Sequence, residues 1–163
     1  MANTTRWVGG SNGSGLTPVS AGLTLTAFNG LVAGSGVVGT TAIANETGLD
    51  QYMAVGGQFV PGATTLAGGF LSLYLLPLNQ YAAGVYGDGT VSGSSVPSPS
   101  YNVGNFLVNA GILSTGMIYF DFGPIVIPPR AFVLGLYNNL GVTLNAAAAA
   151  QVEAYFFDVN LNV

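Results

Sequence analysis

Short runs of alternating apolar and polar residues fill the chain from Leu23 onward, and each run is bounded by Gly, Pro or Asn. A period of two is typical of β-strands, because successive side chains of a strand point to opposite faces. In the run from Phe70 to Leu76, the leucines at odd positions share one face, which we expect to line a core. Tyr74 lies on the opposite, mixed face and is a candidate contact with a neighbouring chain. The alternation predicts an all-β protein.

About eight segments carry this strand pattern, with turn residues between them. They are residues 23–28, 31–38, 52–60, 70–76, 106–110, 117–122, 132–137 and 152–163. A length of 163 residues favours a single domain. About eight short antiparallel strands in one domain fit a two-sheet jelly roll. The expected fold class is therefore an antiparallel, jelly-roll type β-sandwich.

The beginning of the chain differs from the rest. Residues 1–27 are rich in Gly and Ser, and Trp7 and Phe28 are the only aromatic residues among the first fifty positions. A segment with little apolar surface to bury is ordered only by what it touches. We therefore expect an extended N-terminal arm over residues 1–27, anchored by Trp7, and a jelly-roll β-sandwich domain over residues 28–163.

Charged side chains are scarce. The chain has two Lys or Arg and six Asp or Glu residues, 5% of the total, with a net charge of −4. About 25% is ordinary for a globular domain. Because surface charge keeps monomers apart, we expect much of this surface to be covered by copies of the chain or by a partner. The alternative is an ordinary β-domain that neutral polar residues keep soluble. Arg130, beside the Pro128-Pro129 turn, is a candidate to pair with Asp121 or Asp158, or to contact a neighbouring subunit.

The missing residue types exclude several kinds of chemistry. Without His and Cys, the chain has no histidine acid–base catalyst, reactive thiol, disulfide or zinc site. Without Lys it forms no Schiff base, and two Arg with a net charge of −4 give nucleic acid nothing to bind. The sequence shows neither a membrane-spanning apolar run nor a signal-peptide pattern at its start. We expect no cofactor, no metal, no nucleic-acid partner and no membrane partner.

Two motifs contain residues typical of nucleotide binding or of catalysis. The glycines from Gly34 to Gly39 match the spacing of the dinucleotide fingerprint, but the residues after them are a poor helix start. A Gly-rich strand or turn is therefore favoured there. Asp121 and Asp158 have aromatic neighbours and are the best candidates for a pair of catalytic carboxylates. Aspartates on a solvated strand face explain them more simply, so no catalytic residue is assigned and no enzyme is expected.

A long loop is the best candidate for a binding segment. Residues 82–104 contain Gly, Ser, Pro and Asn together with Tyr86 and Tyr101. Loops of this length in a compact domain are usually functional or mobile. In one interpretation of this loop, Tyr86 and Tyr101 are exposed and stack on sugar rings. The alternative function is therefore a glycan-binding or host-receptor-binding β-sandwich module of a virion.

Three stretches carry a resemblance to a known family. They are YMAVGGQFVPGATTLAGGFLSLYLLPL at Tyr52 to Leu78, DFGPIVIPPRAFVLGLYNNLGVTL at Asp121 to Leu144, and the tyrosine-containing last strand from Val152. With their paired glycines, LYLLP motif, Pro-Pro turn and YNN-G ending, they resemble the jelly-roll cement, or decoration, proteins of tailed-bacteriophage capsids. These motifs cover about half of the chain and belong to the scaffold.

The resemblance implies a structural role. It implies a virion protein at the capsid surface, made in the host cytoplasm, commonly a homotrimer, that binds across subunits of the major capsid protein and reinforces the shell. The low charge and the arm predicted from the sequence agree with such a role, because a repeated lattice of binding sites increases avidity. The candidate interface residues are Trp7, Tyr74, Tyr86, Tyr101 and Arg130.

Overall fold

The structure is a computed structural model of the whole chain. It describes residues 4–9, 19–20, 30–39, 41–61, 68–79, 81, 85–87, 101–109, 118–145 and 151–162. For the strands nearest the two ends of the chain, it describes the path of the backbone. The described residues are almost entirely β-strands and their connections, so the predicted all-β class is confirmed.

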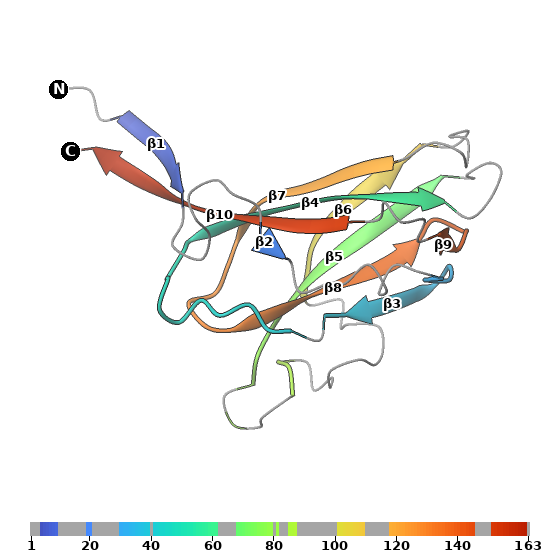
Figure 1. Cartoon of the computed structure of the whole chain (residues 1–163), viewed down its shortest axis with the longest axis horizontal. Helices are drawn as coiled ribbons and strands as arrows, with labels where there is room; N and C mark the ends of the chain where they lie inside the picture. Colours follow the sequence, from blue (N-terminus) through green and yellow to red (C-terminus); the bar gives the residue numbers. More distant parts are fainter. Residues whose placement is uncertain are drawn as a thin grey trace.

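Two antiparallel sheets make up the fold (Figure 1). Their strands are β1 (Thr4–Gly9), β2 (Val19–Ser20), β3 (Ser35–Val38), β4 (Tyr52–Pro61), β5 (Gly69–Pro77), β6 (Asn102–Val108), β7 (Ile118–Val126), β8 (Phe132–Asn139), β9 (Leu144–Asn145) and β10 (Gln151–Asn162). One sheet has the order β1-β10-β4-β7, with β2 beside β10 and β9 beside β4. The other has the order β3-β8-β5-β6. The chain therefore crosses repeatedly between two layers.

The predicted strands differ from the observed ones mainly at their ends. The predictions for 52–60, 70–76, 117–122 and 132–137 correspond to β4, β5, β7 and β8. The segment 31–38 is a strand only from Ser35, because a turn with Gly34 at a φ of 76° precedes it. The prediction for 23–28 lies outside the described residues. The strand predicted at 106–110 begins earlier, at Asn102, so the last residues of the predicted loop 82–104 belong to β6.

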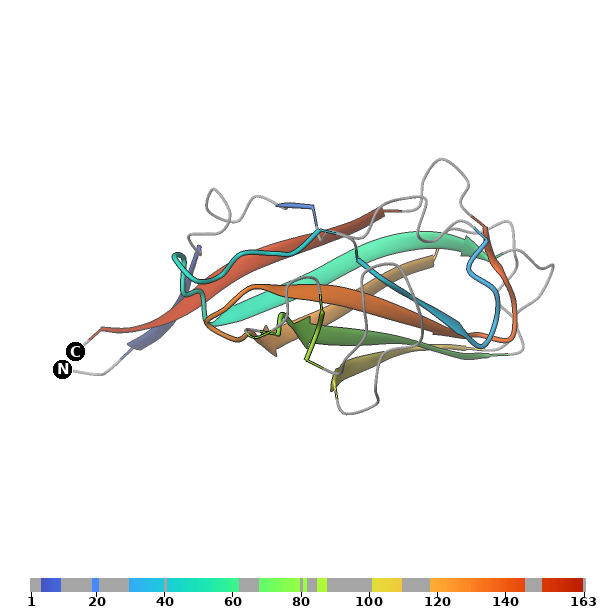
Figure 2. The same ribbon diagram turned by 90° about the horizontal axis from the view of Figure 1, so that it is seen from below.

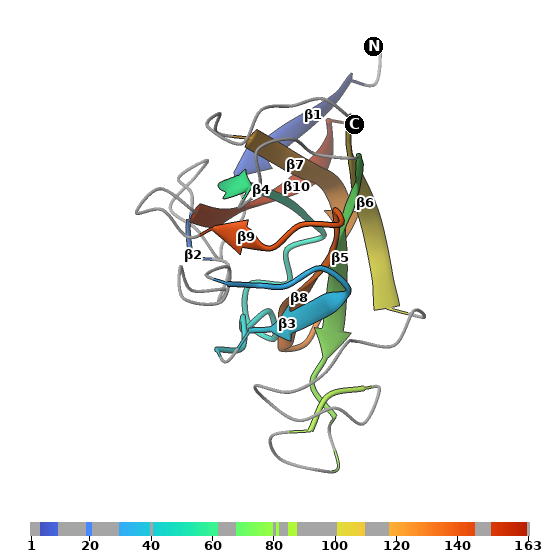
Figure 3. The ribbon, with the colours of Figure 1, turned by 90° about the vertical axis from the view of Figure 1, so that its right-hand side faces the viewer.

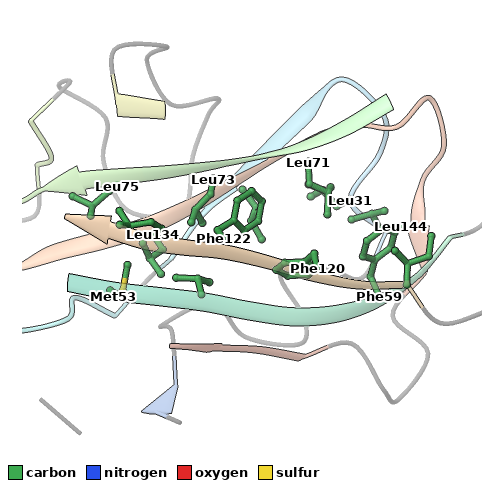
Figure 4. Close-up of a cluster of buried hydrophobic side chains, with 14 of the residues drawn as sticks. Leu31, Met53, Phe59, Leu71, Leu73, Leu75, Phe120, Phe122, Leu134 and Leu144 are labelled. Atoms are coloured by element: carbon green, nitrogen blue, oxygen red, sulfur yellow. The ribbon is translucent and has the colours of Figure 1, made fainter. Parts of the chain in front are cut away.

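The larger apolar core of the described residues lies between the two sheets, which form a β-sandwich (Figure 2). Leu71, Leu73 and Leu75 are buried in it, as the alternation predicted. Figure 4 shows Leu73, Phe122 and Met53 in the layer between β5 and β4. The rings of Phe120 and Phe122 pack edge to face with their centroids 5.6 Å apart. Each fully buried side chain of this size contributes about 1.5–3 kcal/mol to the free energy of unfolding.

Buried asparagines join the loops to the sandwich. The Asn138 side chain, at the end of β8, donates to the carbonyl oxygens of Leu31 and Val142, both at 2.8 Å, and accepts from the Leu140 amide at 3.1 Å. Asn45 does the same elsewhere: it donates to two backbone carbonyl oxygens and accepts from one amide. In the described part of the chain, no buried side-chain nitrogen or oxygen lacks a hydrogen-bond partner. Neutral side-chain amides, rather than charged groups, thus provide these buried links between the loops and the sandwich.

The β4–β5 connection returns to the sandwich through a glycine. Gly69 has a φ of 144°, and a Cβ atom at this position would overlap the carbonyl group of Asn139 on β8. Only glycine allows the two backbones to approach this closely. The second glycine of the Gly68-Gly69 pair is therefore required by packing.

The first and last strands form a ribbon that continues past the sandwich. β10 pairs with β4 over Gln151 to Phe157 and with β1 over Phe157 to Asn162. The paired ends of β1 and β10 therefore extend together beyond the end of β4 (Figures 1 and 2). The division of the chain into an arm at 1–27 and a domain at 28–163 stays a prediction, because most of residues 10–29 lie outside the described part.

We expect Asn138→Ala to lower the free energy of unfolding by about 2–4 kcal/mol, because two carbonyl oxygens and one amide lose their buried partner. Asn139→Ala is the matched control, since Asn139 is the exposed neighbour on the same strand. Urea unfolding followed by tryptophan fluorescence and circular dichroism measures both variants. Equal stabilities of the two variants would contradict the role assigned to Asn138.

Candidate functional site

The four-stranded sheet holds no charged residue. None of β3, β5, β6 and β8 contains Asp, Glu, Lys or Arg. The inner face of this sheet lines the core, so its outer face is the surface available for a partner. That face has two parts, one covered by the chain itself and one open. This outer face is the candidate interaction surface.

A second apolar cluster covers one part of the outer face. Tyr74 and Leu76 of β5, Val133 of β8 and Val38 of β3 are buried there beneath Tyr86. Tyr101 packs against the cluster and is half-buried.

The segment after β5 places Tyr86 on this cluster. Leu78 and Tyr86 form a β-bridge, and the Gly87 amide donates to the Pro77 carbonyl oxygen at 2.7 Å. The Tyr86 hydroxyl donates to the Gly39 carbonyl oxygen at 3.3 Å. The chain therefore folds back onto its own sheet.

The prediction that Tyr86 is exposed is wrong: 3% of its surface is accessible. Tyr74 is also buried, so neither side chain offers a free surface for a neighbouring chain or a sugar. The alternation correctly put Tyr74 on the outer face of β5. It could not show that residues after Pro77 return over that face, because this return depends on contacts between segments far apart in sequence.

The open part of the outer face lies along β6. Leu107 is 74% exposed and stands opposite the half-buried Phe70 of β5. Val103 is also exposed on this strand. Between them, Asn105 accepts hydrogen bonds from the Ser72 hydroxyl at 2.6 Å and from the Asn102 amide at 3.1 Å. Sequence analysis missed Val103 and Leu107, although the alternation of residues 102–108 was a signal for an exposed face.

The outer face of the six-stranded sheet is mixed in character. Tyr119, Asp121 and Val126 are exposed along β7. Tyr119 stands opposite Gln58 of β4, and Val126 stands opposite Tyr52. This face combines apolar, neutral and charged groups, unlike the outer face of the four-stranded sheet.

The remaining predicted residues lie outside the strands of the candidate surface. Trp7 is in β1, in register with Val159, and its side chain is outside the described part. Arg130 is exposed in the turn between β7 and β8. Among the described residues, no group of His, Cys, Asp and Glu could hold a metal ion.

The two aspartates considered for catalysis occupy different rows of the six-stranded sheet. Asp121 is in register with Gly56, and Gly56 is in register with Glu153 on β10. Asp158 is in register with Val8, beyond the last residue of β10 that pairs with β4. It therefore lies about 16 Å along β10 from the Asp121 row. The fingerprint-like glycines run through β3 and its turn, as favoured from the sequence.

The comparisons with known proteins add no relative. The chain matches no family model, no curated protein and no solved structure. None of the described residues forms a helix long and apolar enough to cross a membrane.

We expect Tyr86→Ala to lower the free energy of unfolding by about 3 kcal/mol, because it opens the second cluster to water. Tyr86→Phe should cost about 1 kcal/mol, since it removes only the hydrogen bond to Gly39. Tyr81→Ala is the control, because Tyr81 is 89% exposed and nearby in sequence. Thermal unfolding measures all three variants, and a harmless Tyr86→Ala would show that Tyr86 does not cover the sheet.

Proposed function

We propose that this chain is a structural virion protein, a cement or decoration protein that binds the outside of a major capsid shell and stabilises it. The observation that carries the proposal is a complete sheet without a charged residue, in a chain that is 5% charged overall. Such a surface suits permanent contact with another protein, because its burial does not remove any charged group from water. The resemblance of the scaffold motifs to cement proteins supports the same role.

The sheet order supports a jelly roll, the finer fold class that we propose. Without the two-residue strands β2 and β9, the orders are β1-β10-β4-β7 and β3-β8-β5-β6. In each sheet, strands from the first half of the chain alternate with strands from its second half. Two Greek keys wound together produce this interleaving, which is the jelly-roll arrangement.

The oligomer that we propose is a homotrimer, bound to the major capsid protein at the surface of the virion. The ribbon of β1 and β10 supports a clamping arm, because it leaves the sandwich and, among the described residues, no further strand pairs with β1. A two-stranded ribbon is only marginally stable alone in water, so a neighbouring protein would stabilise it. Trp7 lies in this ribbon and is proposed as an anchor residue.

The glycan-binding or receptor-binding alternative has weaker support. It depended on Tyr86 and Tyr101, of which Tyr86 is buried. The exposed Tyr119 near Asp121 on β7 is the aromatic residue best placed to stack on a sugar. Loss of glycan retention in a Tyr119→Ala variant, with shell binding absent in the parent protein, would favour this alternative.

The proposal predicts a stable oligomer that binds shells. Sedimentation across a dilution series should give a trimer, and the protein should bind saturably to shells assembled from the major capsid protein of the same genome. Bound protein should raise the temperature at which the shells open. Trp7→Ala should weaken shell binding at least tenfold, whereas Tyr81→Ala, in an exposed tyrosine, should leave it unchanged. Failure of the parent protein to bind such shells would overturn the proposal.

A further inference from the structure

The four edges of the two sheets differ in their protection against other strands. An edge strand presents unpaired N–H and C=O groups, and proteins usually protect it with charge, proline or short length. On the six-stranded sheet, the edge strand β1 contains Arg6, and β7 contains Asp121 and Pro124. On the four-stranded sheet, β3 is only four residues long. The fourth edge, β6, has seven residues with neither charge nor proline.

The edge of β6 is open in the described part of the chain. There, β6 pairs with β5 alone, and it lies at the outer side of its sheet, beyond β5 (Figure 3). Its pairing with β5 is regular from Gly104 to Val108, with a register shift before Gly104. Leu107, 74% exposed, belongs to the face that is turned away from the core, and Val103, 38% exposed, is the residue at the register shift that has no partner on β5. An open ladder with exposed aliphatic side chains is complementary to another β-strand.

We propose that the β6 edge pairs antiparallel with β6 of a second copy of this chain, about a two-fold axis that passes beside Asn105. The two four-stranded sheets then continue into one another. In this register Val103 of each copy stands opposite Leu107 of the other, so the exposed aliphatic residues cover one another in pairs. The two Asn105 residues face each other at the axis.

The charge distribution favours a second copy as the occupant. Two copies with a net charge of −4 repel each other in general. The four-stranded sheets bring no charged residue to this contact, so like charges are not forced together at the new strand pair. A strongly charged partner strand would find no counter-charge on this sheet. Pairing with a second copy therefore has a smaller electrostatic cost at this edge than pairing with a strongly charged strand.

The register follows from the side chains. A two-fold centre at Asn105 pairs both exposed aliphatic residues with each other. A centre at Phe106 would instead place Leu107 opposite Asn105, and a centre at Gly104 would place it opposite Tyr101, outside the strand. The Asn105 oxygen is held by Ser72 and Asn102, which leaves its amide nitrogen to donate toward the axis. The centre at Asn105 thus buries the most apolar surface.

This contact is independent of the proposed function, because it requires only copies of the chain. Its two-fold symmetry also differs from that of a trimer, so it would join trimers in pairs rather than form them. A single pair of seven-residue strands buries less than the roughly 800 Å² per partner of a stable complex. The pairing is therefore expected at high local concentration, as on a crowded surface.

Cysteine substitution tests the register directly, because the chain contains no cysteine. Opposite residues of an antiparallel pair have Cα atoms about 4.5–5.5 Å apart, which suits a disulfide. Asn105→Cys should therefore form a covalent dimer under mild oxidation, at least tenfold faster than Tyr81→Cys, a control at a highly exposed site. Leu107→Cys alone should not, since the two copies of residue 107 would be about 13 Å apart. The double variant Val103→Cys/Leu107→Cys should form the dimer again.

A second variant tests the association without a covalent bond. Leu107→Lys should weaken concentration-dependent pairing at least tenfold in sedimentation equilibrium, whereas Val126→Lys, equally exposed on the edge strand β7, should not. Thermal unfolding confirms that both variants fold. The inference is overturned if Asn105→Cys crosslinks no faster than Tyr81→Cys, or if Leu107→Lys and Val126→Lys have equal effects. Crosslinking through Asn105→Cys without any trimer or shell binding would sustain this contact and reject the proposed function.

Discussion

Burial of the apolar faces of two sheets against each other is the constraint on which the rest of the structure depends. With eight charged residues in the chain, stability comes from the core between β4 and β5 rather than from ion pairs. Once the sheets are stacked, the buried backbone groups of the loops that cross between them need hydrogen-bond partners inside the protein. Asn45 and Asn138 meet this need at two such crossings, because one amide side chain serves two carbonyl oxygens and one N–H group.

The same lack of charge shapes the outside of the molecule. Part of the outer face of the four-stranded sheet is covered internally, where Tyr86 lies over Tyr74 and Leu76. The rest of that face, along β6, has no such cover in the described chain and exposes Leu107. Exposing a neutral apolar surface to water costs free energy. Burying the same surface against another protein removes no charged group from water. This surface therefore supports the proposed shell contact and the proposed pairing of β6.

Much of the fold was predictable because it depends on local pattern. The alternation from Phe70 to Leu76 identified the core-facing leucines, and turn residues bounded most strands. The candidate surface was harder to predict. Tyr86 was expected to be exposed because it belongs to the predicted loop 82–104, yet a β-bridge to Leu78 places it on the sheet. The exposure of Leu107 was not predicted, because only the order of the strands shows that β6 is an edge strand.

The sequence by itself determined the all-β class, the faces of the strands, the absence of histidine and thiol chemistry, and the scarcity of charge, because these follow from residue type and period. Only the tertiary structure decided which strands are neighbours and which outer faces are covered. It also decided that Asp121 and Asp158 lie in different rows of the sheet. The periodicity and composition of a sequence describe residues that are close along the chain. The order of the strands and the burial of their outer faces depend instead on contacts between segments that are distant in sequence.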